Sequence, residues 1–213
     1  MEQHQYCAFI SYRHQSPDQE IAKALHTAIE TYGIPAGVKK QTGIKKMGKV
    51  FRDQEELPLS SDLGADIEAA LDRSEWFIAI CSPRYLESKW CLREMEYFIE
   101  KKGRDHVLTV LVEGEPQDSF PEMIRLIRNE DGSVTDIEPL AANVRGATLK
   151  ENLKKLKDEK LRLLAPMLGL SFDDLKRRAR QRKIRIASII AAAVLVAAAA
   201  LTTFLVINHR AAE

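Results

Sequence analysis

The stretch SPRYLESKWCLREMEYF, residues 82–98, decides how the centre of this chain is interpreted. It follows WFIAIC (76–81), a run that is apolar on both sides, as in a strand at the centre of a parallel sheet. The spacing of apolar residues over 82–98 predicts one helix. Glu94 falls within its apolar stripe, because the residues three and four positions away are Trp90, Cys91, Tyr97 and Phe98. A buried strand therefore leads into a helix that carries a carboxylate on its inner face.

Strand and helix patterns alternate on both sides of this stretch. We expect strands at 6–12, 49–51, 76–81 and 106–112, and helices at 16–33 (with Ser16 as N-cap), 63–74, 82–98 and 149–168. The basic connection 34–48 is assigned no element. Residues 113–147 are expected to be irregular, with a short helix at 120–128 and a possible edge strand at 136–140. This alternation predicts an α/β domain built on a doubly wound parallel sheet.

Several polar residues directly follow predicted strands. Ligands of such sheets bind outside the carboxyl ends of the strands, so the loops after Tyr12, Phe51 and Cys81 should share one rim. We expect that rim to hold Arg13, Arg52, Asp53 and Ser82, with the helix that bears Glu94 nearby.

Charge and cysteine content exclude some classes of function. Residues 1–175 contain 24 basic and 30 acidic side chains, a net charge of −6, which argues against nucleic acid as the main partner. The three cysteines lie in hydrophobic sequence and have no metal-ligand spacing, so we expect reduced, buried thiols. The five histidines form no cluster, and no metal site is expected.

The C-terminal part differs sharply from the rest in composition. Residues 186–207 are 22 consecutive uncharged residues, enough to cross a hydrocarbon core of about 30 Å as a helix. Seven basic residues in 176–185 precede them, so the positive-inside tendency places the N-terminal domain in the cytoplasm. A buried helix of a soluble protein is the alternative. We therefore expect a domain at 1–168, a basic juxtamembrane segment at 169–185, a transmembrane helix at 186–207 and an extracytoplasmic tail at 208–213.

The juxtamembrane segment carries a helix-start signal. Ser171 and Asp174 form a capping-box pattern ahead of the basic residues. This favours one helix running directly into the membrane over a flexible basic linker.

Three motifs in order resemble a Toll/interleukin-1 receptor (TIR) domain. They are FISYRH (9–14), VFRDQEELPLSSDLGADIEAAL (50–71) and FIAICSPRYLESKWCLREMEYF (77–98). The resemblance covers roughly residues 4–165 and implies a flavodoxin-like sheet of five parallel strands with helices on both faces. It also implies self-association, and it identifies 52–63 as the mobile loop after the second strand.

Many members of this family cleave NAD⁺, and the resemblance implies a site for that reaction here. Glu94 matches the essential glutamate one turn after a tryptophan, Trp90. Nicotinamide leaves a pyridinium as a neutral molecule, so one carboxylate can stabilise the oxocarbenium and hold the ribose hydroxyls. We expect substrate contacts from Trp90, Arg13, Ser82, Arg52 and Tyr12, with the arginines on the pyrophosphate. NAD⁺ would be the substrate, and no cofactor is expected.

Structural explanations exist for the same residues. Glu94 could be paired with Arg13 or Arg93, Trp90 could belong to the core, and Arg52 could pair with Asp53. Arg13 could instead form an ion pair with the loop after the second strand.

The leading hypothesis is a membrane-anchored NAD⁺ glycohydrolase, which hydrolyses or cyclises its substrate when its subunits cluster. Clustering would bring loop 52–63 of one subunit to Glu94 of another. Bacterial immune or cell-death signalling is the expected context. The alternatives are a non-catalytic scaffold that recruits partner TIR domains and an anchor that assembles into a membrane lesion.

Overall fold

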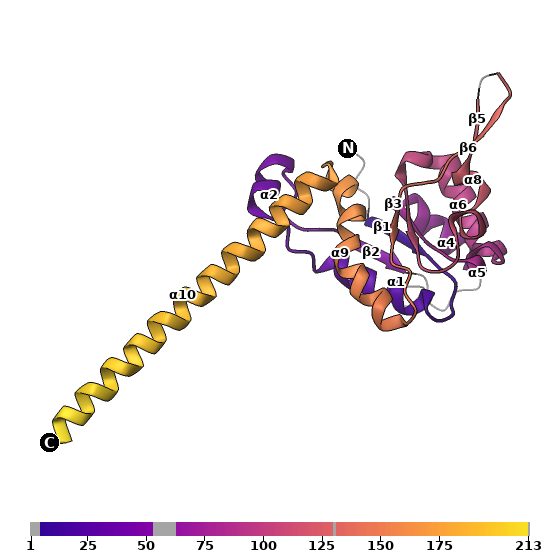
Figure 1. Cartoon of the computed structure of the whole chain (residues 1–213). Coiled ribbons are helices and arrows are strands. Elements are labelled where there is room, and N and C mark those ends of the chain that lie inside the picture. The colour runs from indigo at the N-terminus through magenta and orange to yellow at the C-terminus, as the bar shows by residue number, and fades with distance from the viewer. Residues whose placement is uncertain (1–4, 53–62, 130, 213) are drawn as a thin grey trace.

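A five-stranded parallel sheet forms the centre of the N-terminal domain (Figure 1). The computed structural model describes residues 5–52, 63–129 and 131–212. The strands are β1 (Tyr6–Ser11), β2 (Lys49–Arg52), β3 (Ser74–Cys81), β4 (Val107–Leu111) and β7 (Ala141–Asn143). Their order is β2-β1-β3-β4-β7, and each neighbouring pair is parallel. This is the 2-1-3-4-5 order of flavodoxin-like folds, so the predicted fold class is confirmed.

Helices cover both faces of the sheet and enclose two hydrophobic cores. Helices α1 (Asp18–Glu30) and α9 (Leu149–Met167) pack on one face, and α4 (Leu63–Asp72) and α6 (Lys89–Lys102) pack on the other. Alternation along β1 sends Ala8 and Ile10 to the first core and Phe9 to the second. Ser11, two residues after Phe9, therefore lies on the face covered by α6.

The stretch 82–98 is two helices rather than the single helix predicted. Helix α5 (Pro83–Leu86) ends before Ser88, and α6 begins at Lys89. Ser88 has an extended backbone, and its hydroxyl accepts a hydrogen bond from the Cys91 amide at 3.3 Å. A serine in this role satisfies an amide at a helix start, so α6 begins afresh there.

Two further differences lie in the first fifth of the chain. Helix α1 begins at Asp18 with Pro17 at the N-cap position, so the prediction of Ser16 as N-cap is wrong. The connection 34–48 contains a short helix, α2 (Ala36–Thr42), which ends at Gly43 with φ of 76°. Helix α2 buries Val38 and contacts the C-terminal helix, a tertiary partner that local periodicity does not reveal.

The fifth strand of the sheet is not at 136–140 as predicted. The short helix η1 (Arg104–His106) leads into β4. Between β4 and the last strand lie α7 (Pro116–Ser119), α8 (Glu122–Arg125), β5 (Leu126–Arg128) and β6 (Val134–Asp136). Strands β5 and β6 form an antiparallel hairpin that projects from the domain (Figure 1). The edge strand is β7, which begins after Pro139.

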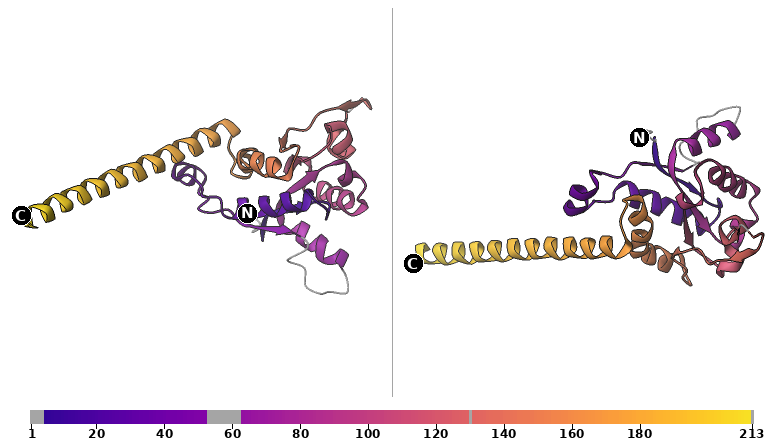
Figure 2. Two further views of the ribbon diagram at one scale, coloured as in Figure 1. Left: turned by 60° about the horizontal axis from the view of Figure 1, so that its bottom comes forward. Right: turned by 90° about the horizontal axis from the view of Figure 1, so that it is seen from above.

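The C-terminal helix α10 (Phe172–Ala212) is continuous and leaves the domain as a long rod (Figures 1 and 2). The Asp174 amide donates to Ser171 Oγ at 3.3 Å, which is the predicted cap. Leu175 is fully buried and ties the first turn of α10 into the core. Within the described residues, α10 is the one helix that is long and apolar enough to cross a membrane, by length and composition.

Candidate active site

A cavity of about 390 Å³ opens where β1 ends beside the start of α6. The loop after β1 supplies one wall, and α6, with one side chain of α4, supplies the other. Its lining residues are Tyr12, Arg13, His14, Gln15, Ile67, Ser88, Trp90, Cys91 and Glu94. The cavity lies at the carboxyl end of a strand, as expected for this fold.

Glu94 is only 7% exposed, and its carboxylate is held from the sheet. Ser11 Oγ donates to Glu94 Oε2 at 2.6 Å, across 83 positions of sequence. The same hydroxyl lies 3.1 Å from Tyr85 Oη, which also donates to the Cys91 carbonyl at 3.2 Å. Burial raises the pKa of Tyr85 well above its ordinary value, so its hydroxyl stays a donor at neutral pH. This network orients the carboxylate toward the cavity.

Sequence analysis did not identify Ser11 or Tyr85. Ser11 follows Phe9 by two positions and so lies on the α6 face of β1, a signal visible once that face is known. Tyr85 lies just after β3, within residues 82–85, and is fully buried. In the sequence it therefore resembles an ordinary aromatic residue of the core.

Trp90 lies one turn before Glu94 and is 57% exposed, which contradicts the alternative that it belongs to the core. Its ring lines the cavity beside Glu94. A flat indole at this position can stack on a ring of a ligand.

Arg13 lines the same cavity and is partly buried. Its buried Nε has no hydrogen-bond partner among the described residues. The other arginine considered as a partner of Glu94, Arg93, forms a surface ion pair with Glu68 at 3.3 Å. Arg13 thus presents a guanidinium donor that an anionic ligand in the cavity could occupy.

Tyr12 and Arg52 lie together toward the face of the sheet that α1 and α9 cover. Arg52 is 3% exposed, and its Nη1 donates to Tyr12 Oη at 3.3 Å. Tyr12 also lines the cavity, and its ring is tilted against that of His14, with ring centroids 4.8 Å apart. Arg52 is not among the lining residues. Asp53 and the rest of the predicted loop up to residue 62 lie outside the described residues.

Ser82 belongs to a second polar cluster and does not line the cavity. It is fully buried and donates to Asp18 Oδ2 at 2.6 Å. Arg84 bridges Asp18 at 3.3 Å and Glu113 at 2.6 Å. Burial raises the pKa of Asp18, and the bonds from Ser82 and Arg84 oppose that rise. The cluster joins the start of α1 to the loops after β3 and β4.

Metal-ligating side chains are not grouped in the described parts of the chain, where no set of three or more His, Cys, Asp or Glu could hold an ion. All three cysteines are free thiols within the described ranges. Burial raises the pKa of Cys7 to about 12 and also raises that of Cys81.

The TIR domain family matches residues 8–138, more than half of the chain. The chain belongs to the TIR domain family. The NAD(+) hydrolase ApTIR of Actinoplanes sp. is 33% identical to this TIR domain over 110 residues, which are 52% of this chain and 14% of that relative. The chain thus matches a small part of that protein.

A solved diflavin flavoprotein A3 of Nostoc sp. is 13% identical and has a TM-score of 0.38 over 83% of this chain and 97% of that chain. The flavodoxin-like fold of the TIR domain is defined by its own strand order, β2-β1-β3-β4-β7.

The TIR domain therefore brings four of the predicted site residues to one cavity: Glu94, Trp90, Arg13 and Tyr12. A carboxylate beside an exposed indole and a guanidinium can stabilise a developing cation while holding an anionic group further along the ligand.

Proposed function

We propose that this TIR domain cleaves the bond between nicotinamide and ribose in NAD⁺. The single observation that carries the proposal is the near-buried carboxylate of Glu94, oriented by Ser11 at 2.6 Å on the wall of a cavity of about 390 Å³. The NAD(+) hydrolase activity named for the relative ApTIR supports the same reaction class.

The reaction breaks the C1′–N bond, and the bonding electrons go to the pyridinium nitrogen. Nicotinamide leaves as a neutral molecule, and positive charge develops on the ribose. Glu94 stabilises that charge electrostatically and accepts hydrogen bonds from the ribose hydroxyls. Water then adds to C1′ and releases a proton to give ADP-ribose, or a nitrogen of the adenine adds instead to give a cyclic product.

The other cavity residues position the substrate. Arg13 binds the pyrophosphate through its guanidinium, and Trp90 stacks on a ring at the cavity mouth. Tyr12 completes the wall opposite α6, and Arg52 acts on the substrate through Tyr12. Ser82 serves the Asp18 cluster, so its contribution to binding is indirect.

Self-association through TIR surfaces and attachment through α10 complete the proposal. Clustered subunits would activate one another, with residues 52–63 of one chain beside Glu94 of the next. The apolar helix would hold the clusters on the cytoplasmic side of a membrane, in a bacterial immune or cell-death response.

The test is NAD⁺ consumption by the full chain in liposomes over a wide range of protein density, with Glu94→Gln as the variant. We expect a steep rise with density and a loss of about 10²-fold or more in the variant. Arg93→Gln, on the same helix but paired with Glu68 at the surface, is the matched control and should retain activity.

The non-catalytic scaffold is the second candidate function. It would show no NAD⁺ consumption by either protein even after chemical cross-linking, together with unchanged self-association of Glu94→Gln. The exposed Trp90, 57% accessible, suits a binding surface as well as a substrate wall.

A further inference from the structure

A second, larger cavity lies on the opposite face of the sheet from Glu94. It measures about 710 Å³ and is enclosed by the end of α1, by α9 and by the first turns of α10. Helices α1 and α9 belong to the other hydrophobic core, so this cavity shares no wall with the candidate active site.

Basic side chains dominate this cavity. Two acidic residues, Asp158 and Glu159, accompany six basic ones: Lys157, Lys160, Arg162, Lys176, Arg180 and Lys183. Glu159 is already paired with Arg162 at 2.8 Å. In the part of the chain that the structure describes, no carboxylate forms an ion pair with the remaining five.

The cations are held close together, and Asp158 compensates them only in part. Burial and the neighbouring Lys183 lower the pKa of Lys160. The ring of Phe172 lies under Arg162 at 4.3 Å and under Lys176 at 5.3 Å, which fixes two of the basic groups. An anion of more than one negative oxygen would relieve this repulsion.

A buried hydroxyl also lines the cavity. Tyr32 Oη has no hydrogen-bond partner among the described residues, although it is inaccessible from outside. A ligand oxygen would reach this atom only if the surrounding side chains moved, and it would then supply the partner that buried polar groups normally have. Cations together with a phenol donor match the chemistry of a phosphate ester.

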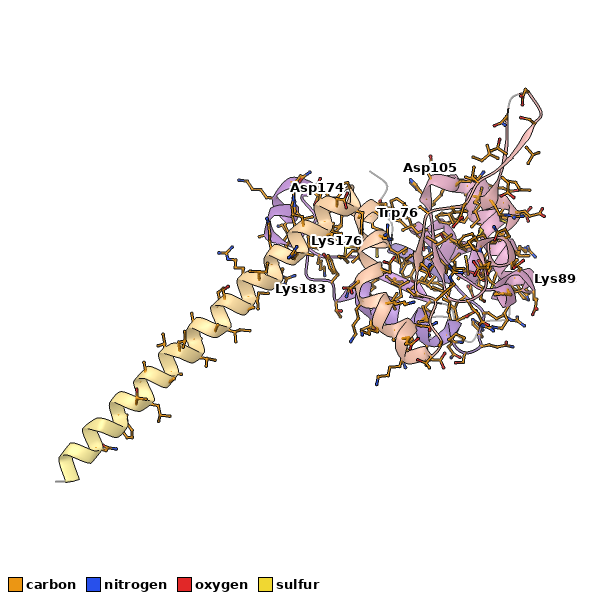
Figure 3. All side chains as sticks on the ribbon, viewed as in Figure 1. Trp76, Lys89, Asp105, Asp174, Lys176 and Lys183 are labelled. Atoms are coloured by element: carbon orange, nitrogen blue, oxygen red, sulfur yellow. The ribbon has the colours of Figure 1, made fainter. Side chains whose placement is uncertain are left out.

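The position of the cavity relative to the apolar span identifies the source of that phosphate. Lys176 and Lys183 lie on the part of α10 beside the domain (Figure 3), and the uncharged run starts at residue 186. At about 1.5 Å per residue, Lys183 is about 5 Å and Lys176 about 15 Å from the start of the hydrocarbon. The headgroup layer is about 5–8 Å deep on each side of the bilayer. The end of the cavity that contains Lys183 would therefore lie within this headgroup layer.

We propose that this cavity binds the phosphate headgroup of an anionic membrane lipid in the leaflet where α10 enters. The acyl chains would run along the exposed apolar side chains of α10, such as Ile189, which is 60% exposed. The bound lipid would join α9 to α10 and fix the orientation of the domain above the membrane.

The test uses the full chain in neutral detergent micelles doped with phosphatidylglycerol, with phosphatidylcholine as the uncharged comparison. Lipid that binds only the folded protein raises Tm with its concentration. We expect phosphatidylglycerol to raise Tm and phosphatidylcholine to leave it unchanged. The double variant Lys160→Gln/Lys176→Gln should weaken phosphatidylglycerol binding about tenfold or more.

The matched control is Lys154→Gln/Arg177→Gln, which removes the same charge from the same two helices outside the cavity. It should bind within about twofold of the unchanged protein. Equal weakening by both double variants would overturn the proposal in favour of diffuse attraction. A Tm rise with inorganic phosphate and none with phosphatidylglycerol would overturn it in favour of a soluble ligand. This inference rests on the membrane attachment proposed for α10. Because the readout is Tm and not NAD⁺ consumption, its failure can be distinguished from failure of the proposed reaction.

Discussion

At the scale of single residues, the candidate site depends on one contact between a strand and a helix. Ser11 is the last residue of β1, and its hydroxyl reaches Glu94 at 2.6 Å from the α6 face of the sheet. A charged acceptor makes this hydrogen bond stronger than one between neutral groups. In the proposed reaction, Ser11 is therefore a positioning residue for the carboxylate, and Glu94 is the residue that would contact the substrate.

Ser11→Ala should lower kcat for NAD⁺ cleavage about ten- to a hundredfold with little change in KM, because the carboxylate loses its orientation. Tyr85→Phe is the control, since its hydroxyl contacts Ser11 but not Glu94, and it should lower kcat less. Steady-state kinetics give kcat and KM of both variants and of the unchanged protein at one protein density. A change confined to KM would contradict the positioning role.

Cys7 provides a pH-dependent prediction at the same scale. Burial raises the pKa of its thiol to about 12 in the folded chain, from an ordinary value of 9.0. Below pH 9 the thiol is protonated in both the folded and the unfolded chain, so the full contribution of the buried thiol to the free energy of unfolding is present. It is lost as pH rises from 9 toward 12, because the unfolded thiol ionises first.

We therefore expect the free energy of unfolding to fall more steeply for the unchanged protein than for Cys7→Ala above about pH 9, by at most about 1.4 kcal/mol per pH unit. Urea denaturation of both proteins from about pH 8 to about pH 10 measures the difference. Parallel pH dependence in the two proteins would show that the thiol ionises equally in both states.

At the scale of elements, the break between α5 and α6 sets the direction of the helix that carries Glu94. Ser88 terminates one helix and caps the next, and it also lines the cavity. With one uninterrupted helix from residue 82, the side chains of α6 would follow the axis of α5. The cap thus links a local hydrogen bond to the position of Trp90 and Glu94.

Ser88→Ala should reduce the free energy of unfolding by about 1 kcal/mol, because the Cys91 amide loses its acceptor. Ser88→Asn retains a capping oxygen and should restore most of that loss. Chemical denaturation of the three proteins makes the comparison. Equal loss in both variants would indicate that packing around Ser88, rather than its cap, is what matters.

At the scale of the whole molecule, the chain combines a compact α/β domain with a rod that leaves it without a break (Figure 2). Leu175 fixes the rod in the core, and Arg178 donates to Gln41 of α2 at 2.7 Å. Arg182 also donates to the Gly33 carbonyl. These contacts transmit the tilt of the helix to the domain, so a membrane around α10 would constrain the direction of the candidate active-site cavity.

The membrane orientation can be tested with a single cysteine at each end. Ala211→Cys should react with a membrane-impermeant maleimide on intact cells, because it follows the apolar run. Lys154→Cys, at an exposed position of α9, should react only after permeabilisation. The unchanged chain reports the background from its own thiols. The reverse pattern of labelling would contradict a cytoplasmic domain.

The sequence by itself determined what depends on local periodicity. Alternating strand and helix patterns predicted a doubly wound parallel sheet, and the TIR resemblance implied its flavodoxin-like form. The uncharged run predicted the candidate span, and helical spacing placed Glu94 on an inner face. These features follow from residues a few positions apart, which share one face of one element. The Ser171 cap was predictable for the same reason.

Only the tertiary structure decided which elements meet. Ser11 and Glu94 are 83 positions apart in the sequence. Ser82 forms its hydrogen bond with Asp18, 64 positions away, and does not line the cavity. Arg52 is buried behind Tyr12 on the far face, and the basic cavity joins Tyr32 to Lys183. These pairings arise from the stacking of helices on the two faces of the sheet, a choice made by the packing of whole elements that no local pattern contains.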